Sequence, residues 1–160
     1  MKIAVTGHRP NKVGGYNENN PLAAAIKSNM RQILSLAKES DLMVISGMAL
    51  GIDQWWAEAA IELKIPFIAA IPFMGMESKW PAVSQDRFYE IISYADSIVY
   101  VCDPGYEPWK MQKRNEWMVD NCDKLVAYWD GSPGGTANCV QYARAKGRII
   151  DIINPNMIGA

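Results

Sequence analysis

The chain lacks a long hydrophobic run, which argues against an integral membrane protein. None of its apolar stretches approaches the length of about 18 residues that a membrane-spanning helix needs. The first ten residues, MKIAVTGHRP, do not form a signal peptide, because their apolar run is short and ends at once in Gly-His-Arg-Pro. We therefore expect no membrane partner and a cytoplasmic location.

Histidine and paired cysteine are also scarce. His8 is the single histidine, and the three cysteines, Cys102, Cys122 and Cys139, contain no CxxC pair. These shortages argue against a structural zinc site, and widely spaced cysteines fit a reducing compartment. The sequence predicts neither a metal ion nor a bound cofactor.

Neither sign of charge dominates. The chain has 16 Lys and Arg residues and 17 Asp and Glu residues, which gives a net charge of −1. This balance argues against a broadly basic surface that coats DNA, although it is compatible with a local basic groove. The length of 160 residues predicts one domain over 1–160, and an apolar content of 49% is enough for a core.

Short apolar runs alternate with longer amphipathic segments. We expect strands, mostly apolar throughout as in buried parallel sheets, at 2–7, 42–47, 66–72, 97–101, 124–129 and 148–153. We expect helices at 20–39, 52–64, 79–94, 110–121 and 134–146. This order predicts an α/β, Rossmann-like fold with three α/β/α layers and a mostly parallel, doubly wound sheet. Ligands bind such folds beyond the carboxyl ends of the strands.

The stretch SGMALGIDQWWAEAA, Ser46 to Ala60, follows the second expected strand. Its glycines permit a tight turn and close approach to a ligand, and the following helix N-terminus favours phosphate. An aspartate in the first turn could bind ribose hydroxyls, or it could merely complement the helix dipole. The two tryptophans fall on the apolar stripe of the helix, which favours a core role. The candidate ligand-binding residues here are Ser46, Gly47, Gly51, Asp53 and Gln54.

A second glycine-rich turn, DGSPGGTAN, follows the fifth expected strand. A glycine-rich turn with a hydroxyl at the helix start is typical of a phosphate cradle, although an ordinary capped turn is the alternative. The turn is neither a Walker motif nor a GxGxxG fingerprint. Its candidate residues are Asp130, Gly131, Gly134, Gly135, Thr136 and Asn138.

Two further segments supply polar candidates. TGHRP follows the first strand and contributes Thr6, Gly7, His8 and Arg9, of which the arginine could pair with phosphate. KRNEW lies on the fourth expected helix and contributes Arg114 and Asn115, for which a solvated helix face is the alternative.

These motifs together resemble a known family. SGMALGID resembles the glycine-rich motif of the DNA-processing protein DprA/Smf, and PGGTAN resembles the phosphate motif of the LOG family, which cleaves cytokinin ribotides. With GHRP, PFMGMESKWP, RNEWMVDNCDKLVAYWDG and GGTANCV, the chain resembles the YpsA-like branch of the SLOG superfamily over almost its whole length. The resemblance implies a Rossmann-like fold and a site for nucleotides or nucleotide-derived ligands.

The sequence also departs from its relatives. LOG enzymes have a glutamate after the phosphate motif, whereas no acid follows Thr136 here before Asp151. The candidates for a catalytic carboxylate are therefore Asp53 and Glu58, from the other turn. The net charge of −1 argues against carrying over single-stranded DNA binding from the DNA-processing protein.

Three functions follow from these observations. The first is binding of a nucleotide or an ADP-ribose-like ligand, as a sensor or binding domain. The second is a nucleotide N-glycosidase or ribosyl transferase, and the sequence does not decide whether the protein is an enzyme. The third, not favoured, is a single-stranded nucleic-acid binder that stacks bases on Trp80, Tyr106 and Trp109 near Lys110, Lys113 and Arg114. Nine methionines and several aromatics are also compatible with a homo-oligomer.

Overall fold

The computed structural model describes residues 1–15 and 17–158, which form six strands, five α-helices and two short 3-10 helices. The strands are β1 (Lys2–Gly7), β2 (Met43–Ser46), β3 (Phe67–Ile71), β4 (Ser97–Tyr100), β5 (Lys124–Tyr128) and β6 (Ile149–Ile153). The helices are α1 (Pro21–Ala37), α2 (Ile52–Glu62), α3 (Ala82–Ile92), α4 (Pro108–Asn121) and α5 (Gly135–Ala145). The 3-10 helices are η1 (Pro10–Lys12) and η2 (Pro155–Met157).

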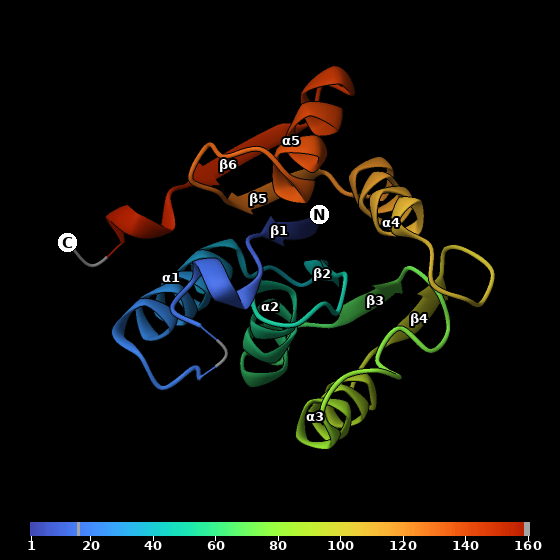
Figure 1. Ribbon diagram of the computed structural model, residues 1–160. Helices are drawn as coiled ribbons and strands as arrows, with labels where there is room; N and C mark the ends of the chain where they lie inside the picture. The colour runs from blue at the N-terminus through green and yellow to red at the C-terminus, as the bar shows by residue number, and fades with distance from the viewer. Residues whose placement is uncertain (16, 159–160) are drawn as a thin grey trace.

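All six strands are parallel and form one sheet in the order β4-β3-β2-β1-β5-β6. The chain winds outward from β1 to β4 and then returns to place β5 on the other side of β1 (Figure 1). The connections after β1 and β5 therefore leave toward opposite faces of the sheet. This arrangement makes the β1–β5 pair the topological switch point, where ligands bind in open α/β sheets.

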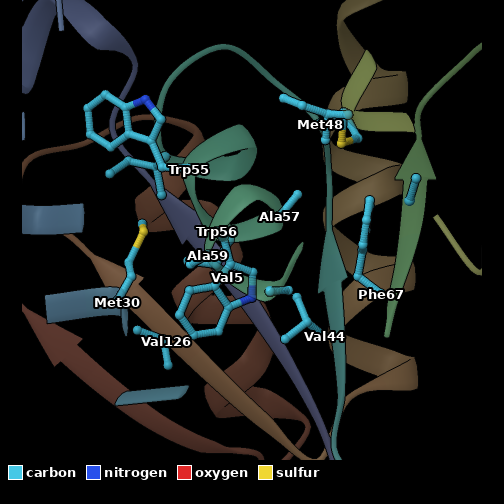
Figure 2. Close-up of a cluster of buried hydrophobic side chains, with 14 of the residues drawn as sticks. Val5, Met30, Val44, Met48, Trp55, Trp56, Ala57, Ala59, Phe67 and Val126 are labelled. Atoms are coloured by element: carbon cyan, nitrogen blue, oxygen red, sulfur yellow. The ribbon is translucent and has the colours of Figure 1, made fainter. Parts of the chain in front are cut away.

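Helices cover both faces of the sheet. Helices α1, α2 and α3 lie on one side, and α4 and α5 lie together on the other (Figure 1). The larger core lies under α1 and α2, where Trp55 and Trp56 are 2% and 0% exposed (Figure 2). The Trp56 indole nitrogen donates to the carbonyl of Ile3 at 3.4 Å, so its polar atom is satisfied within the core. The expected core role of both tryptophans is confirmed.

The expected Rossmann-like fold is confirmed, and its sheet is parallel throughout. The main differences lie at the sheet edges, where most residues of β4 and β6 are exposed because helices cover less of them. Helix α4 begins at Pro108, earlier than the expected 110, because proline is well suited to the first turn of a helix. The segment between β1 and α1 contains η1, which begins at Pro10.

Among the residues that the structure describes, no helix is long and apolar enough to cross a membrane.

Candidate functional site

A polar crevice of about 350 Å³ opens beyond the carboxyl ends of β1 and β5, at the topological switch point. It is bounded by the segment after β1, the start of α2, the inner face of α4 and the start of α5. The two glycine-rich turns, which are about 80 residues apart in the sequence, therefore face one cavity. Its lining residues are Thr6, Gly7, His8, Arg9, Asn11, Lys12, Ala49, Leu50, Ile52, Asp53, Met111, Arg114, Asn115, Ser132, Pro133, Gly134, Gly135 and Thr136.

The end of β1 forms the floor of the crevice. Gly7 is required there, because a Cβ atom at this position would lie 2.6 Å from Cγ2 of Ile52. The absence of a side chain lets the first turn of α2 approach the strand closely. His8 is 7% exposed, and its Nε2 lies 2.9 Å from Oδ1 of Asp130 and 3.0 Å from the Asp130 backbone nitrogen. The imidazole therefore ties β1 to the turn after β5 instead of standing free in the crevice.

The start of α2 forms one wall. Its N-cap is Gly51, whose φ of 87° is in the left-handed region and which has no side chain to cap the helix. The first amides of α2 consequently lack a side-chain cap, and the positive end of the helix dipole faces the crevice. Ser46 Oγ donates to the Asp53 carbonyl at 2.6 Å, and Ala49 N–H donates to Asp53 Oδ2 at 3.3 Å. These bonds fix the Asp53 carboxylate in the wall.

Asp53 and Arg114 are buried charges of opposite sign. They are 8% and 4% exposed, and both line the crevice. Burial raises the pKa of the Asp53 carboxyl, while the charge of Arg114 and the Ala49 amide oppose that shift. Burial also lowers the pKa of Arg114, but a guanidinium remains protonated at neutral pH. Arg114 Nη1 donates to the carbonyls of Gly47 and Ala70, so this side chain links α4 to β2 and β3.

The start of α5 forms the opposite wall. Its N-cap is Gly134, at φ 140°, and it too supplies no side-chain cap. Asp130 Oδ1 accepts from the Ser132 amide at 2.9 Å and from its hydroxyl, which lowers the pKa of Asp130 to about 2, with His8 assisting. Lys12 Nζ donates to Ser132 Oγ at 3.0 Å and brings an exposed ammonium to this wall. The wall combines bare amides with a cation, as anion sites do.

The structure sorts the expected site residues into three groups. The first group lines the crevice: Thr6, Gly7, His8, Arg9, Asp53, Arg114, Asn115, Gly134, Gly135 and Thr136. The second group shapes the turns without lining it: Ser46, Gly47, Gly51, Gln54, Asp130 and Gly131. The third group lies outside: Asn138 is exposed on α5, and Glu58 forms an ion pair with Arg87.

Several lining residues were missed from the sequence. Asn11 and Lys12 belong to the unpredicted 3-10 helix, and Met111 lies one turn before the predicted Asn115 on α4. The sequence feature that could have identified Lys12 is its positive charge shortly after the GHRP motif. Nothing in the sequence indicated that Met111 faces the same cavity, because that depends on how α4 packs on the sheet.

Helix α4 carries the three cations considered for nucleic-acid binding, and two of them are buried. Of its three cations, Lys110 is 6% exposed and Arg114 is 4% exposed, and both donate to backbone carbonyls. Lys113 is exposed and lies 3.9 Å from Glu116. Backbone carbonyls therefore already accept hydrogen bonds from two of the three cations that were considered as partners for nucleic-acid phosphates.

The sheet order and the crevice at the switch point define a Rossmann-like α/β protein with a polar site built on two glycine-capped helices. The particular family follows from comparison with known proteins. The YpsA family model, described as the YspA SLOG family, matches residues 3–155, and the chain belongs to this family. Membership supports nucleotides or nucleic acids as the general class of ligand.

Similar sequences occur in Bacillus and its relatives. The SPbeta prophage-derived protein YoqJ of Bacillus subtilis is 34% identical over 143 residues, which cover 78% of this chain and 84% of YoqJ. A UPF0398 protein of Brevibacillus brevis is 30% identical over 153 residues, which cover 91% of this chain and 81% of that protein.

Solved structures share the fold at low sequence identity. DNA processing protein A (DprA) from Streptococcus pneumoniae has a TM-score of 0.70 at 21% identity, over 96% of this chain and 50% of the DprA chain. DprA from Helicobacter pylori, described with a single-stranded DNA binding mode, has a TM-score of 0.70 at 17% identity, over 96% of this chain and 65% of that one. This chain thus spans half to two thirds of those longer proteins.

Proposed function

We propose that the crevice binds a nucleotide or a nucleotide-derived ligand, of the ADP-ribose kind, and that the protein acts as a binding or sensor domain. The observation that carries the proposal is the meeting of two glycine-capped helix N-termini at the switch point of the sheet. Both present amides without side-chain caps to one cavity, and exposed cations border it. This combination fits a phosphorylated sugar better than an apolar ligand.

The phosphate fits best at the start of α5. There the amides of Gly135 and Thr136 lie in the first turn, and both residues line the cavity. Arg9 and Lys12 are the exposed cations of the crevice, so they are freer to pair with phosphate than the buried Arg114. Arg114 is buried in the crevice lining and instead contributes a positive charge that is fixed in place.

The ribose fits beside Asp53. This residue lines the crevice, and the Ala49 amide orients one oxygen of its carboxylate. A carboxylate that accepts hydrogen bonds from vicinal hydroxyls is a common ribose contact. Glu58 does not compete for this role, because it lies outside the crevice.

Isothermal titration tests the proposal. AMP, ADP-ribose and cyclic nucleotides should give measurable heats with the wild-type protein, and Asp53→Asn should weaken the binding of those with free ribose hydroxyls by about tenfold. Glu58→Gln is the matched control, since it neutralises an acid of the same helix outside the crevice. The absence of heat with every ligand at millimolar concentration would overturn the proposal.

Hydrolysis of an N-glycosidic bond is the second candidate. Asp53 is the single carboxylate among the described residues that line the crevice, and burial raises its pKa toward the range of a general acid or base. In that reaction water adds to C1′ of the ribose, the bond to the base breaks, and the base leaves with a proton. Chromatography should then show free base released from a nucleotide by the wild type and not by Asp53→Asn. Intact nucleotide after long incubation would exclude this activity for the nucleotides tried.

A further inference from the structure

A second, larger cavity of about 740 Å³ adjoins the polar crevice. The two cavities share three lining residues, Arg9, Ala49 and Met111, so they are parts of one continuous depression. The second part is richer in aromatic and methionine side chains. Its aromatic and methionine lining residues, besides Met111, are Phe73, Met74, Met76, Trp80 and Tyr106.

Aromatic rings form the walls of this second cavity. Phe73 is 4% exposed, and its ring meets the ring of Tyr106 edge to face, with centroids 6.2 Å apart. Trp80 is held in the same manner against Phe88 in the core, at 5.7 Å. Tyr106 is 65% exposed, which leaves much of its surface unpaired beside the opening. Phe73 and Trp80 are therefore fixed by packing, whereas Tyr106 offers free aromatic surface.

A buried lysine holds the loop that carries Tyr106. Lys110 Nζ donates to the carbonyls of Asp103 and Gly105, both at 2.8 Å, and lies 5.8 Å from the centroid of Phe73. An ammonium that is 6% exposed needs such partners to offset the loss of water. The lysine thus fixes the loop next to Phe73.

We propose that this aromatic cavity is the base subsite for the nucleotide whose phosphate and ribose bind in the polar crevice. The inference rests on the proposed function and specifies it. The two cavities place groups in the order of a nucleoside 5′-phosphate: the α5 amides for phosphate, Asp53 for ribose, and the aromatic walls for the base. The shared residues Ala49 and Met111 lie where the sugar would join the base. Flat π-systems prefer aromatic neighbours, and methionine adapts to irregular shapes.

The test compares AMP with ribose 5-phosphate, which has the same phosphate and sugar but carries no base. By isothermal titration, AMP should bind the wild type at least about tenfold more tightly. Tyr106→Ala and Trp80→Ala should each remove most of that advantage while leaving ribose 5-phosphate affinity unchanged. Tyr100→Ala is the control, because this exposed tyrosine of β4 lies outside both cavities.

The outcomes separate the two proposals. Equal affinity for AMP and ribose 5-phosphate would overturn the base subsite. It would still support binding of the phosphate and sugar in the crevice. An AMP advantage that survives both substitutions would also overturn it, since the base would then bind elsewhere. Trp80→Phe guards against misfolding: it retains an aromatic wall and should keep the AMP advantage. If neither compound binds, both proposals fail together.

Discussion

The guanidinium of Arg114 and the carboxylate of Asp53 both lie against the bare α-carbon of Gly47. A Cβ atom on that glycine would stand 2.6 Å from Arg114 Nη1 and 2.8 Å from Asp53 Oδ2. The glycine after β2 therefore lets an arginine from α4 and an aspartate from α2 reach the same strand end. Gly47 thereby brings both helical layers to one strand end beneath the crevice, so it should control stability as well as binding.

Gly47→Ala is expected to destabilise the protein by about 1–3 kcal/mol, because the new methyl group overpacks two buried charged groups. Urea unfolding measures the change. Gly135→Ala is the matched control, since a Cβ atom there meets nothing within 4 Å and alanine is a better helix former than glycine. Wild-type stability in Gly47→Ala would show that Arg114 and Asp53 are free to move apart.

Arg9→Gln and Lys12→Gln are each expected to weaken nucleotide binding by about threefold to tenfold, with a steeper loss in low salt, because both are exposed cations at the crevice. Thermal stability should stay unchanged. Titration in low and high salt measures the effect. Arg144→Gln removes one positive charge at the far end of α5 and should bind as the wild type does. An equal loss in that control would point to overall charge instead of local contacts.

Asp130 should contribute stability that depends on pH. Its hydrogen bonds to Ser132 and its contact with His8 lower its pKa from 3.8 to about 2. The contribution is therefore fully present above about pH 4 and is lost as the pH falls toward 2. Asp130→Asn should lower Tm at neutral pH, and the difference from wild type should shrink over that acidic range. Asp86→Asn, at an exposed position on α3, should show no such convergence.

The buried cysteines should be inert in the folded protein. Burial raises the pKa of Cys139 to about 12 and that of Cys122 to about 11, so neither thiol ionises appreciably at pH 8. Brief alkylation with iodoacetamide should therefore modify only the partly exposed Cys102, as read by mass spectrometry. Unfolding in urea should expose all three. Native labelling of Cys139 would show that α5 opens from the sheet, which would weaken its role as a fixed phosphate wall.

Sequence periodicity predicted the fold well, since strands buried on both faces are apolar throughout and helices carry a stripe. The same patterning placed the two glycine-rich turns at one sheet edge. Helical geometry also explains a miss, because Glu58 follows Asp53 by five residues and a rotation of about 100° per residue turns it well away from the crevice.

The neighbours of each side chain could not be predicted so well. The sequence offered Arg114 as a site residue or as part of a solvated helix face, and the structure buries it against Gly47, 67 positions earlier in the chain. Lys110 looked like an exposed cation, but it is buried among loop carbonyls. Both outcomes depend on how α4 docks on the sheet, which is a long-range property that local patterns do not encode.

Backbone amide chemical shifts, recorded by NMR while AMP is added, test the central claim most directly. The account predicts that the largest changes fall on 6–12 and 132–136, followed by 49–53, where the amides would meet phosphate and ribose. Changes that are absent, or that concentrate outside both cavities, for example at the β4 edge, would contradict a nucleotide site in this crevice.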